Sequence, residues 1–120
     1  MKKLSCLSIM FLAIAMVSCS TKNFNEREIV GRWFSVSWLR EGQDTGLAAW
    51  FEFNEDKTYR SVIDRNQEEG KWWIDGYKLY TQAAGEERIV VKIELLDAGN
   101  LELRMNRGGQ DELLIFTRGQ

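Results

Sequence analysis

Carboxylates and serines are the first side chains to consider for acid–base or nucleophilic catalysis in this 120-residue chain. Two carboxylates in facing loops could act as the acid–base pair of a glycosidase. The carboxylates at or near expected loops are Glu52, Asp56, Asp64, Glu68, Glu69 and Asp75. Carboxylates this common in loops are usually solvated, so we interpret them as surface residues. Ser35, Ser37 and Ser61 have no histidine to activate them, because the chain contains none. No cluster has the ligand spacing of a zinc or calcium site. We therefore expect no enzyme, no metal and no cofactor.

Cys19 has the clearest chemistry, because of the residues that precede it. Residues 1–3 carry two lysines, residues 7–17 are apolar but too few to span a bilayer stably, and Ser18 is small. This order resembles a bacterial lipoprotein signal. The resemblance implies a signal peptide over residues 1–18, cleavage after Ser18 and acylation of Cys19. The alternative is an ordinary secretory peptide that leaves Cys19 as a free thiol.

The residues after Cys19 bear on location and on the start of the domain. Residues 20–23 contain neither an aspartate next to the cysteine nor an acidic run. In lipoproteins, an aspartate next to the acylated cysteine resembles a signal for retention in the inner membrane. An acidic run after the cysteine resembles a surface-export signal in lipoproteins of the Bacteroides type. The resemblance therefore favours the periplasmic face of the outer membrane. Residues 19–28 predict a polar, lipidated tether that ends in a short helical turn, with Asn25 as its cap and Glu28 three residues on.

Composition excludes one class of partner. Removing residues 1–18 leaves 14 Lys and Arg against 18 Asp and Glu, spread along the chain. Nucleic-acid binding needs clustered basic residues, so no nucleic-acid partner is expected. Five Trp, six Phe and three Tyr are many for so small a domain. Large aromatic side chains help a short chain to bury enough surface to fold.

From residue 29 to residue 120 the chain predicts an all-β domain. Short apolar or alternating runs are separated by turn signals at hairpin spacing, and Asp75-Gly76 predicts a tight hairpin. The expected strands are 29–40, 48–53, 57–64, 70–75, 77–82, 88–95, 101–106 and 112–118. Residues 65–69 are polar and predict a loop. Eight sequential antiparallel strands favour an up-and-down barrel, with a flattened sandwich or an opened barrel as the alternative.

Three motifs, taken in order, resemble the small lipocalin-like domains of lipoproteins from Bacteroides relatives. Residues 31–33 match the Gly-x-Trp of the first strand. Residues 51–53 and 56–59 match a hydrophobic strand, a polar turn and a Thr-Tyr pattern, and residues 70–76 resemble the Gly-x-Trp strand that follows. Together the motifs span nearly the whole domain, and they imply a lipocalin-like barrel.

The resemblance also implies a barrel-base signature, formed by Gly31, Trp33 and Arg118. Lipocalins pair the tryptophan of the first strand with an arginine near the end of the last strand, and Arg118 stands at the matching position. A guanidinium over the Trp33 ring would make a cation–π contact and tie the first strand to the last.

Two sets of aromatic residues are candidates for binding. The set expected to face inward could line a ligand pocket or could simply fill the core. It comprises Trp33, Phe51, Phe53, Tyr59 and Trp72. Trp73 is expected to face outward beside Trp72, as Phe34 and Trp50 do beside their inward neighbours. Trp73 is then a surface contact for a partner or membrane, or a ring lying on a lysine or arginine stem.

These observations predict a non-enzymatic envelope protein, held at the membrane through Cys19, that binds a small apolar or amphipathic ligand. The alternative is a solid-core barrel that docks another protein of the cell envelope.

Overall fold

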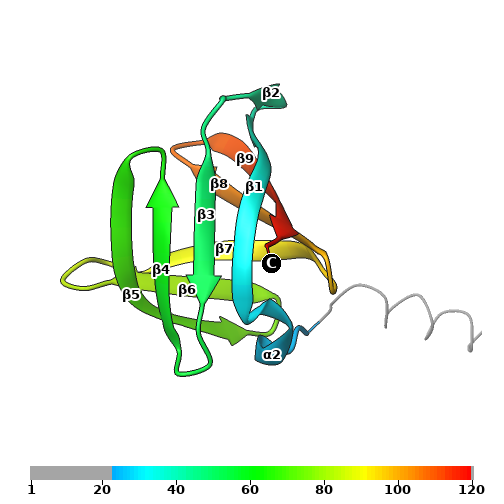
Figure 1. The fold of residues 1–120 in the computed structure, drawn as a ribbon. Helices are drawn as coiled ribbons and strands as arrows, with labels where there is room; N and C mark the ends of the chain where they lie inside the picture. Colours follow the sequence, from blue (N-terminus) through cyan, green and yellow to red (C-terminus); the bar gives the residue numbers. More distant parts are fainter. Residues whose placement is uncertain (1–22, 120) are drawn as a thin grey trace, which may run out of the picture.

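Eight strands of the described chain wind in sequence order into a closed antiparallel barrel, with one helical turn, α2 (Glu26–Ile29), across one end (Figure 1). This computed structural model describes residues 23–119. The predicted signal peptide and Cys19 lie outside the described residues. The strands are β1 (Gly31–Arg40), β2 (Gln43–Asp44), β3 (Ala49–Phe53), β4 (Thr58–Ile63), β5 (Asn66–Asp75), β6 (Lys78–Ala83), β7 (Ile89–Leu96), β8 (Asn100–Arg107) and β9 (Gln110–Arg118).

The barrel closes because β1 pairs with both β3 and β9. Its first half pairs with β3, from Gly31 opposite Phe53 to Phe34 opposite Trp50. Its length from Trp33 to Arg40 pairs with β9. Every other barrel strand pairs with the next one along the chain, so the topology is up-and-down. The eight-stranded antiparallel barrel predicted from the sequence is confirmed.

Most strand boundaries differ from the prediction by one or two residues, and two elements differ by more. β5 starts at Asn66 rather than Gly70, because a two-residue turn places Asn66 opposite Ile63 on β4. The prediction of a loop over residues 65–69 was therefore wrong for Asn66–Glu69. The two-residue β2 was not expected either. It forms because Glu41 and Gly42 adopt φ values of 50° and 79°, which fold the chain back onto the end of β1.

The helical turn predicted at residues 25–28 is present and closes the base, the end of the barrel beside α2. The Asn25 side chain accepts a hydrogen bond from the Arg27 amide at 2.9 Å, and the Asn25 amide donates to Glu28 at 3.4 Å. This is a capping box, which satisfies amides that the helix itself leaves unbonded. The turn buries Ile29 completely against the barrel.

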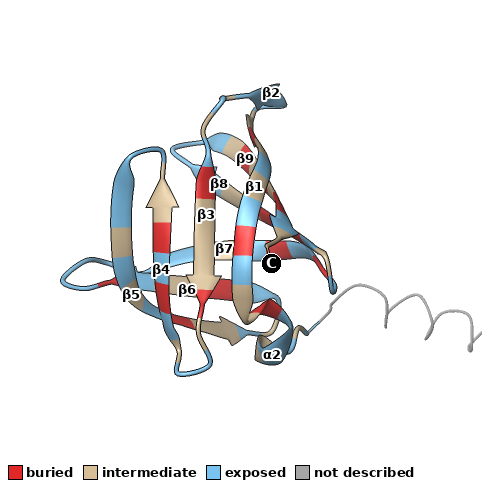
Figure 2. Cartoon of the chain, viewed as in Figure 1, coloured by how far each residue is buried: buried red, intermediate tan, exposed pale blue. Residues whose placement is uncertain are grey.

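The core is densest at the base. Buried positions follow the inner faces of the strands, as alternation along a strand requires (Figure 2). Trp33, Phe53, Trp72 and Phe116 are each at most 1% exposed. Phe53 meets Trp72 edge-on, with ring centroids 5.5 Å apart. These large side chains fill the lower part of the barrel.

The opposite end, the mouth, is splayed. Asn66–Glu69 of β5 pair with β4 but have no partner on β6 in the register of the described strands. Ile89–Val91 of β7 likewise pair with β6 but not with β8. The β6–β7 hairpin therefore extends away from β5 on one side and from β8 on the other, as Figure 1 shows at the left.

The second Gly-x-Trp motif marks the point where this divergence begins. A Cβ atom at Gly70 would lie 2.0 Å from the Gln82 carbonyl oxygen on β6, so only glycine lets the two backbones approach here. The residues of β5 that precede Gly70 are no longer paired with β6.

Candidate ligand site

The base is sealed by Trp33 and Arg118. The Arg118 guanidinium carbon lies 4.1 Å from the centroid of the Trp33 ring, which is the cation–π contact expected from the sequence. Its nitrogens donate to the carbonyls of Glu28 and Val30, at 2.7 and 2.8 Å, and to that of Ala98 at 2.7 Å. This one side chain therefore links the end of β9 to the helical turn and to the β7–β8 turn.

Gly31 makes room for this arginine. Its φ of 129° lies in a region that L side chains rarely adopt, and a Cβ there would sit 2.5 Å from an Arg118 terminal nitrogen. The Trp33 indole nitrogen donates to the Ile29 carbonyl at 2.8 Å, so the ring is fixed by backbone from below. Gly31, Trp33 and Arg118 are thus one connected cluster at the base.

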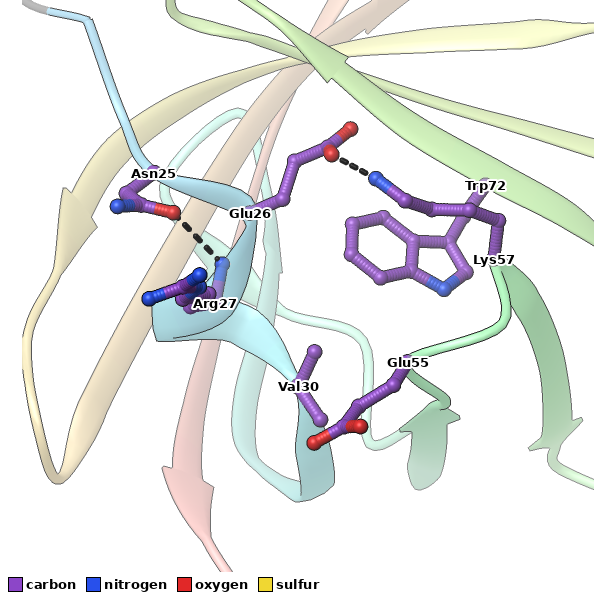
Figure 3. Close-up of a pocket in the computed structure, with 7 residues that line it drawn as sticks. All are labelled: Asn25, Glu26, Arg27, Val30, Glu55, Lys57 and Trp72. Carbon is purple, nitrogen blue, oxygen red and sulfur yellow. Dashed lines mark hydrogen bonds and ion pairs between the residues drawn. The ribbon is translucent and has the colours of Figure 1, made fainter.

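Trp72 lies on the outer side of this base, at the back of an open groove (Figure 3). The groove has a volume of about 620 Å³. Its lining is mostly polar or charged and comprises Asn25, Glu26, Arg27, Val30, Glu55, Lys57 and Trp72. The Lys57 ammonium lies over the Trp72 ring and pairs with Glu26, whose second oxygen accepts a hydrogen bond from the Ile74 amide. These contacts join α2 to the β3–β4 turn and to β5.

A second cavity, of about 420 Å³, lies inside the barrel and opens at the mouth. Apolar side chains dominate its lining. They are Trp38, Phe51, Phe53, Tyr59, Ile63, Leu79, Ile89, Val90, Val91, Leu103, Met105 and Leu114, with Ser61, Glu68, Thr81, Asn106 and Arg107 as the polar members.

The five aromatic residues predicted to line a ligand pocket lie in two different places in the structure. Phe51, Phe53 and Tyr59 line the interior cavity. Trp33 and Trp72 do not, because they stand lower in the barrel, where the core is packed. Trp33 is a residue of the packed base core, and Trp72 lines the base groove rather than the interior cavity.

The cavity contains a polar cluster on β4 and β5. The Tyr59 hydroxyl, on a residue 2% exposed, donates to Glu68 at 3.0 Å. Burial first, and then the hydrogen bond to the negative Glu68, raise the pKa of Tyr59 well above its usual value. Ser61 stands opposite Glu68 in the β4–β5 register and is also 2% exposed.

Sequence reasoning missed this cluster, since it interpreted Glu68 as a solvated loop residue and Ser61 only as a nucleophile without a base. The signal that could have found the cluster was the alternation of side chains along a strand, in which residues an even number of positions apart share a face. Ser61 is two residues from Tyr59 on one strand, and Glu68 is four residues from Trp72 on the next. Both spacings place the side chains on the inner face once β5 is extended to Asn66.

A third group of polar residues joins β1, β8 and β9 at the rim of the mouth. Glu112 is 2% exposed and accepts hydrogen bonds from the Trp38 indole at 2.7 Å and from Arg40 and Arg107 at 3.3 Å each. Burial alone would raise the pKa of Glu112. The Trp38 hydrogen bond and the charges of Arg107 and Arg40 outweigh burial and hold that pKa below its usual value.

Trp73, the predicted surface contact, is half-buried rather than free on the surface. Its ring stacks on Tyr80, with centroids 5.2 Å apart and planes 2° apart, and Arg88 lies over Tyr80. Other apolar side chains are exposed on the outer face of β1, next to β3. Phe34 is 40% exposed, Val36 is 63% exposed at a register shift in β1, and half-buried Trp50 pairs with Phe34 across the strands.

Two further observations concern only residues 23–119. They contain no group of three or more Cys, Asp or Glu side chains placed to hold a metal ion. None of their helices is long and apolar enough to cross a bilayer.

Comparison of the whole sequence with known protein families and with curated proteins finds no match in either. The interior cavity is therefore interpreted from its own geometry.

Proposed function

We propose that this protein is a non-enzymatic barrel that binds a small apolar or amphipathic molecule in its mouth. The observation that carries the proposal is the interior cavity of about 420 Å³, which opens among apolar and aromatic side chains. Small-molecule sites in proteins are typically concave, mostly apolar and about 300–1,000 Å³ in volume, with a few polar groups to orient the ligand. The cavity has each of these properties.

The distribution of large side chains supports this proposal over core filling. Small eight-stranded barrels have just enough interior for side chains or for one small ligand. Here Trp33, Trp72 and Phe116 pack at the base. The upper interior also holds aromatic residues, but smaller residues such as Ser61, Val91 and Met105 stand among them and leave the cavity open. The base groove is larger but offers charges of both signs, of which Glu26 and Lys57 are already paired with each other.

A matched pair of substitutions tests the proposal. Val91→Trp should fill the cavity and weaken binding of the neutral dye N-phenyl-1-naphthylamine by about tenfold or more, because Val91 lines it. Val36→Trp makes the same chemical change on the outer face and should leave the affinity unchanged. Failure of the unsubstituted protein to bind the dye, or an equal loss in both variants, would contradict cavity binding.

We infer that the chain is a lipocalin-like lipoprotein anchored through Cys19 to the periplasmic face of the outer membrane. The signal-like residues before Cys19 and the Gly-x-Trp and arginine pattern support this inference. Asn23 lies four residues after Cys19, a reach of roughly 14 Å. The Phe24 amide is bonded to the Gly76 carbonyl at the base. An anchored barrel would thus hold its base toward the bilayer and its mouth away from it.

Cys19→Ala tests the anchor. The variant should leave the membrane fraction, because acyl chains supply the stable attachment. A Cys6→Ala variant is the control, since Cys6 lies within the predicted signal peptide. Continued membrane association of Cys19→Ala would show that acylation is not the anchor.

A second candidate function is docking of another envelope protein, favoured by the exposed Phe34 and Val36 beside Trp50. Native mass spectrometry of protein purified from its own membranes separates the two functions. A co-purifying small mass that is lost in Val91→Trp supports the ligand. A stoichiometric protein that is lost in Phe34→Ser supports docking.

A further inference from the structure

The polar side of the interior cavity indicates what kind of ligand it accepts. Ser61 on β4 and Glu68 on β5 stand directly opposite one another in the strand register, and both line the cavity. Tyr59 lies two residues before Ser61 on the same face and is hydrogen-bonded to Glu68. The three side chains form one polar patch in a mostly apolar wall.

The Ser61 hydroxyl is available to a ligand. Ser61 is 2% exposed, and its hydroxyl has no hydrogen-bond partner among residues 23–119. Every fully enclosed side-chain nitrogen or oxygen in that range does have a partner. The hydroxyl therefore opens onto the cavity, where an unmet hydrogen bond is costly unless a ligand or water supplies it.

The Glu68 carboxylate is also incompletely satisfied. One oxygen accepts the Tyr59 hydroxyl hydrogen bond, and the other has no partner in the described part of the chain. No lysine or arginine of that part forms an ion pair with Glu68. Glu86, on the β6–β7 loop, also acts on the Tyr59 hydroxyl as a negative charge. Two carboxylates, Glu68 and Glu86, therefore act on this side of the cavity.

The opposite side of the mouth carries an ion cluster of its own. Arg107 is the one cation among the cavity-lining residues of the described chain. Its Nε already bonds to buried Glu112, which Arg40 also contacts. Buried Glu112 needs these cations, because an unpaired charge there would be strongly disfavoured. Glu68 is thus the charge that faces the cavity without a counter-ion.

We propose that the ligand is a hydrophobic amine, whose ammonium group binds Glu68 and the Ser61 hydroxyl while its apolar body occupies the rest of the cavity. The proposal rests on the proposed function and specifies its ligand class. An ammonium group offers several donors and no acceptor, which matches two acceptor oxygens in one patch. A carboxylate ligand would instead place a second negative charge beside Glu68.

Three probes with the same ten-carbon chain test the charge preference on the purified full chain by calorimetry: decylamine, decanol and decanoate. Decylamine should bind about tenfold or more tightly than decanol, since hydrogen bonds to charged groups are the stronger class. Decanoate should bind most weakly of the three. In Glu68→Gln, which keeps an acceptor for Tyr59, the preference for decylamine over decanol should disappear.

Glu69→Gln is the matched control. Glu69 is the next residue on β5, is exposed, and does not line the cavity. The Glu69→Gln substitution removes the same charge from the acidic protein, so it reports any non-specific electrostatic attraction of the amine. Its decylamine affinity should equal that of the unsubstituted protein.

The outcomes separate the two proposals. If none of the three probes binds, both the proposed function and the amine assignment are overturned. If the probes bind but decanoate equals decylamine, the cavity binds ligands and the amine assignment is wrong. An equal loss of decylamine affinity in Glu68→Gln and Glu69→Gln would overturn the assignment in the same way, because the effect would then be one of net charge.

Discussion

The contacts that seal the base and the polar contacts inside the mouth use different kinds of partner. At the base, the indoles of Trp33 and Trp72 donate to the backbone carbonyls of Ile29 and Asn54. Arg118 also donates to backbone carbonyls only. At the mouth, polar side chains bond instead to other side chains, as in the pairs Tyr59–Glu68 and Trp38–Glu112.

This difference has a physical consequence. A backbone carbonyl is positioned by the fold, so a side chain bound to it can be released only if the fold loosens. A side-chain partner can rotate, and a ligand can replace it at little cost to the strands. The base is therefore suited to hold the barrel closed, while the mouth is suited to exchange its contacts. Substitutions at the two ends should separate stability from binding.

Trp33→Ala should produce the largest loss of stability. Trp33 is completely buried, and truncating a large aromatic in a packed core costs about 3–5 kcal/mol of unfolding free energy. Phe51→Ala is the comparison at the mouth, and it should cost less because Phe51 is half-buried beside existing cavity space. Urea unfolding measures both. Equal losses would mean that the two ends are packed alike.

Arg118→Met should come next. The substitution keeps the length of the stem but removes the cation over Trp33 and three hydrogen bonds to carbonyls. We expect a loss of about 2 kcal/mol in unfolding free energy. Arg118→Lys keeps the charge with fewer donors and should fall between the two. If Arg118→Lys is as stable as the unsubstituted protein, charge rather than hydrogen bonding closes the base.

Much of this architecture could be predicted from the sequence because local signals agreed with one another. Hairpin-length turns and alternating runs such as Leu101–Asn106 predicted the number of strands and their order. Asn25 and Glu28 predicted the capped helical turn, which needs only local contacts. The Trp33–Arg118 contact came from a family resemblance, since nothing local links residues 85 positions apart.

The height of a side chain along the barrel could not be predicted. Alternation indicates that Trp72 and Tyr59 both face inward, but it does not give the tilt and register that place one at the base and the other in the cavity. Asn66–Glu69 were missed for a related reason. A strand of polar residues has the composition of a loop, and only its partner on β4 makes it a strand.

Glu112→Gln should have a smaller effect, and the effect should depend on pH. Neutralising the residue weakens three hydrogen bonds, so we expect a loss of about 1 kcal/mol at pH 7. The folded state holds the pKa of Glu112 below its usual value of 4.5. Its contribution is therefore fully present above pH 4.5 and is lost as the pH falls through the folded pKa.

Urea unfolding of Glu112→Gln and the unsubstituted protein between pH 7 and pH 3 checks this sign. The stability difference should stay constant down to about pH 4.5 and then shrink. Other carboxylates with lowered pKa, such as Glu52, titrate in both proteins and cancel in the difference. A difference that grows toward acid would contradict the assigned direction.

Tyr59→Phe should have the smallest effect on folding and the clearest effect on binding. The ring remains, and Glu68 loses one donor but still faces the cavity, where water can replace the hydroxyl. We expect a loss of less than about 1 kcal/mol in urea unfolding, together with a changed affinity for decylamine. Trp33 and Arg118 cannot give this combination, because their polar partners are backbone carbonyls that the fold holds in place. If Tyr59→Phe instead destabilises the barrel as Trp33→Ala does, the mouth is part of the structural core and its contacts are not exchangeable.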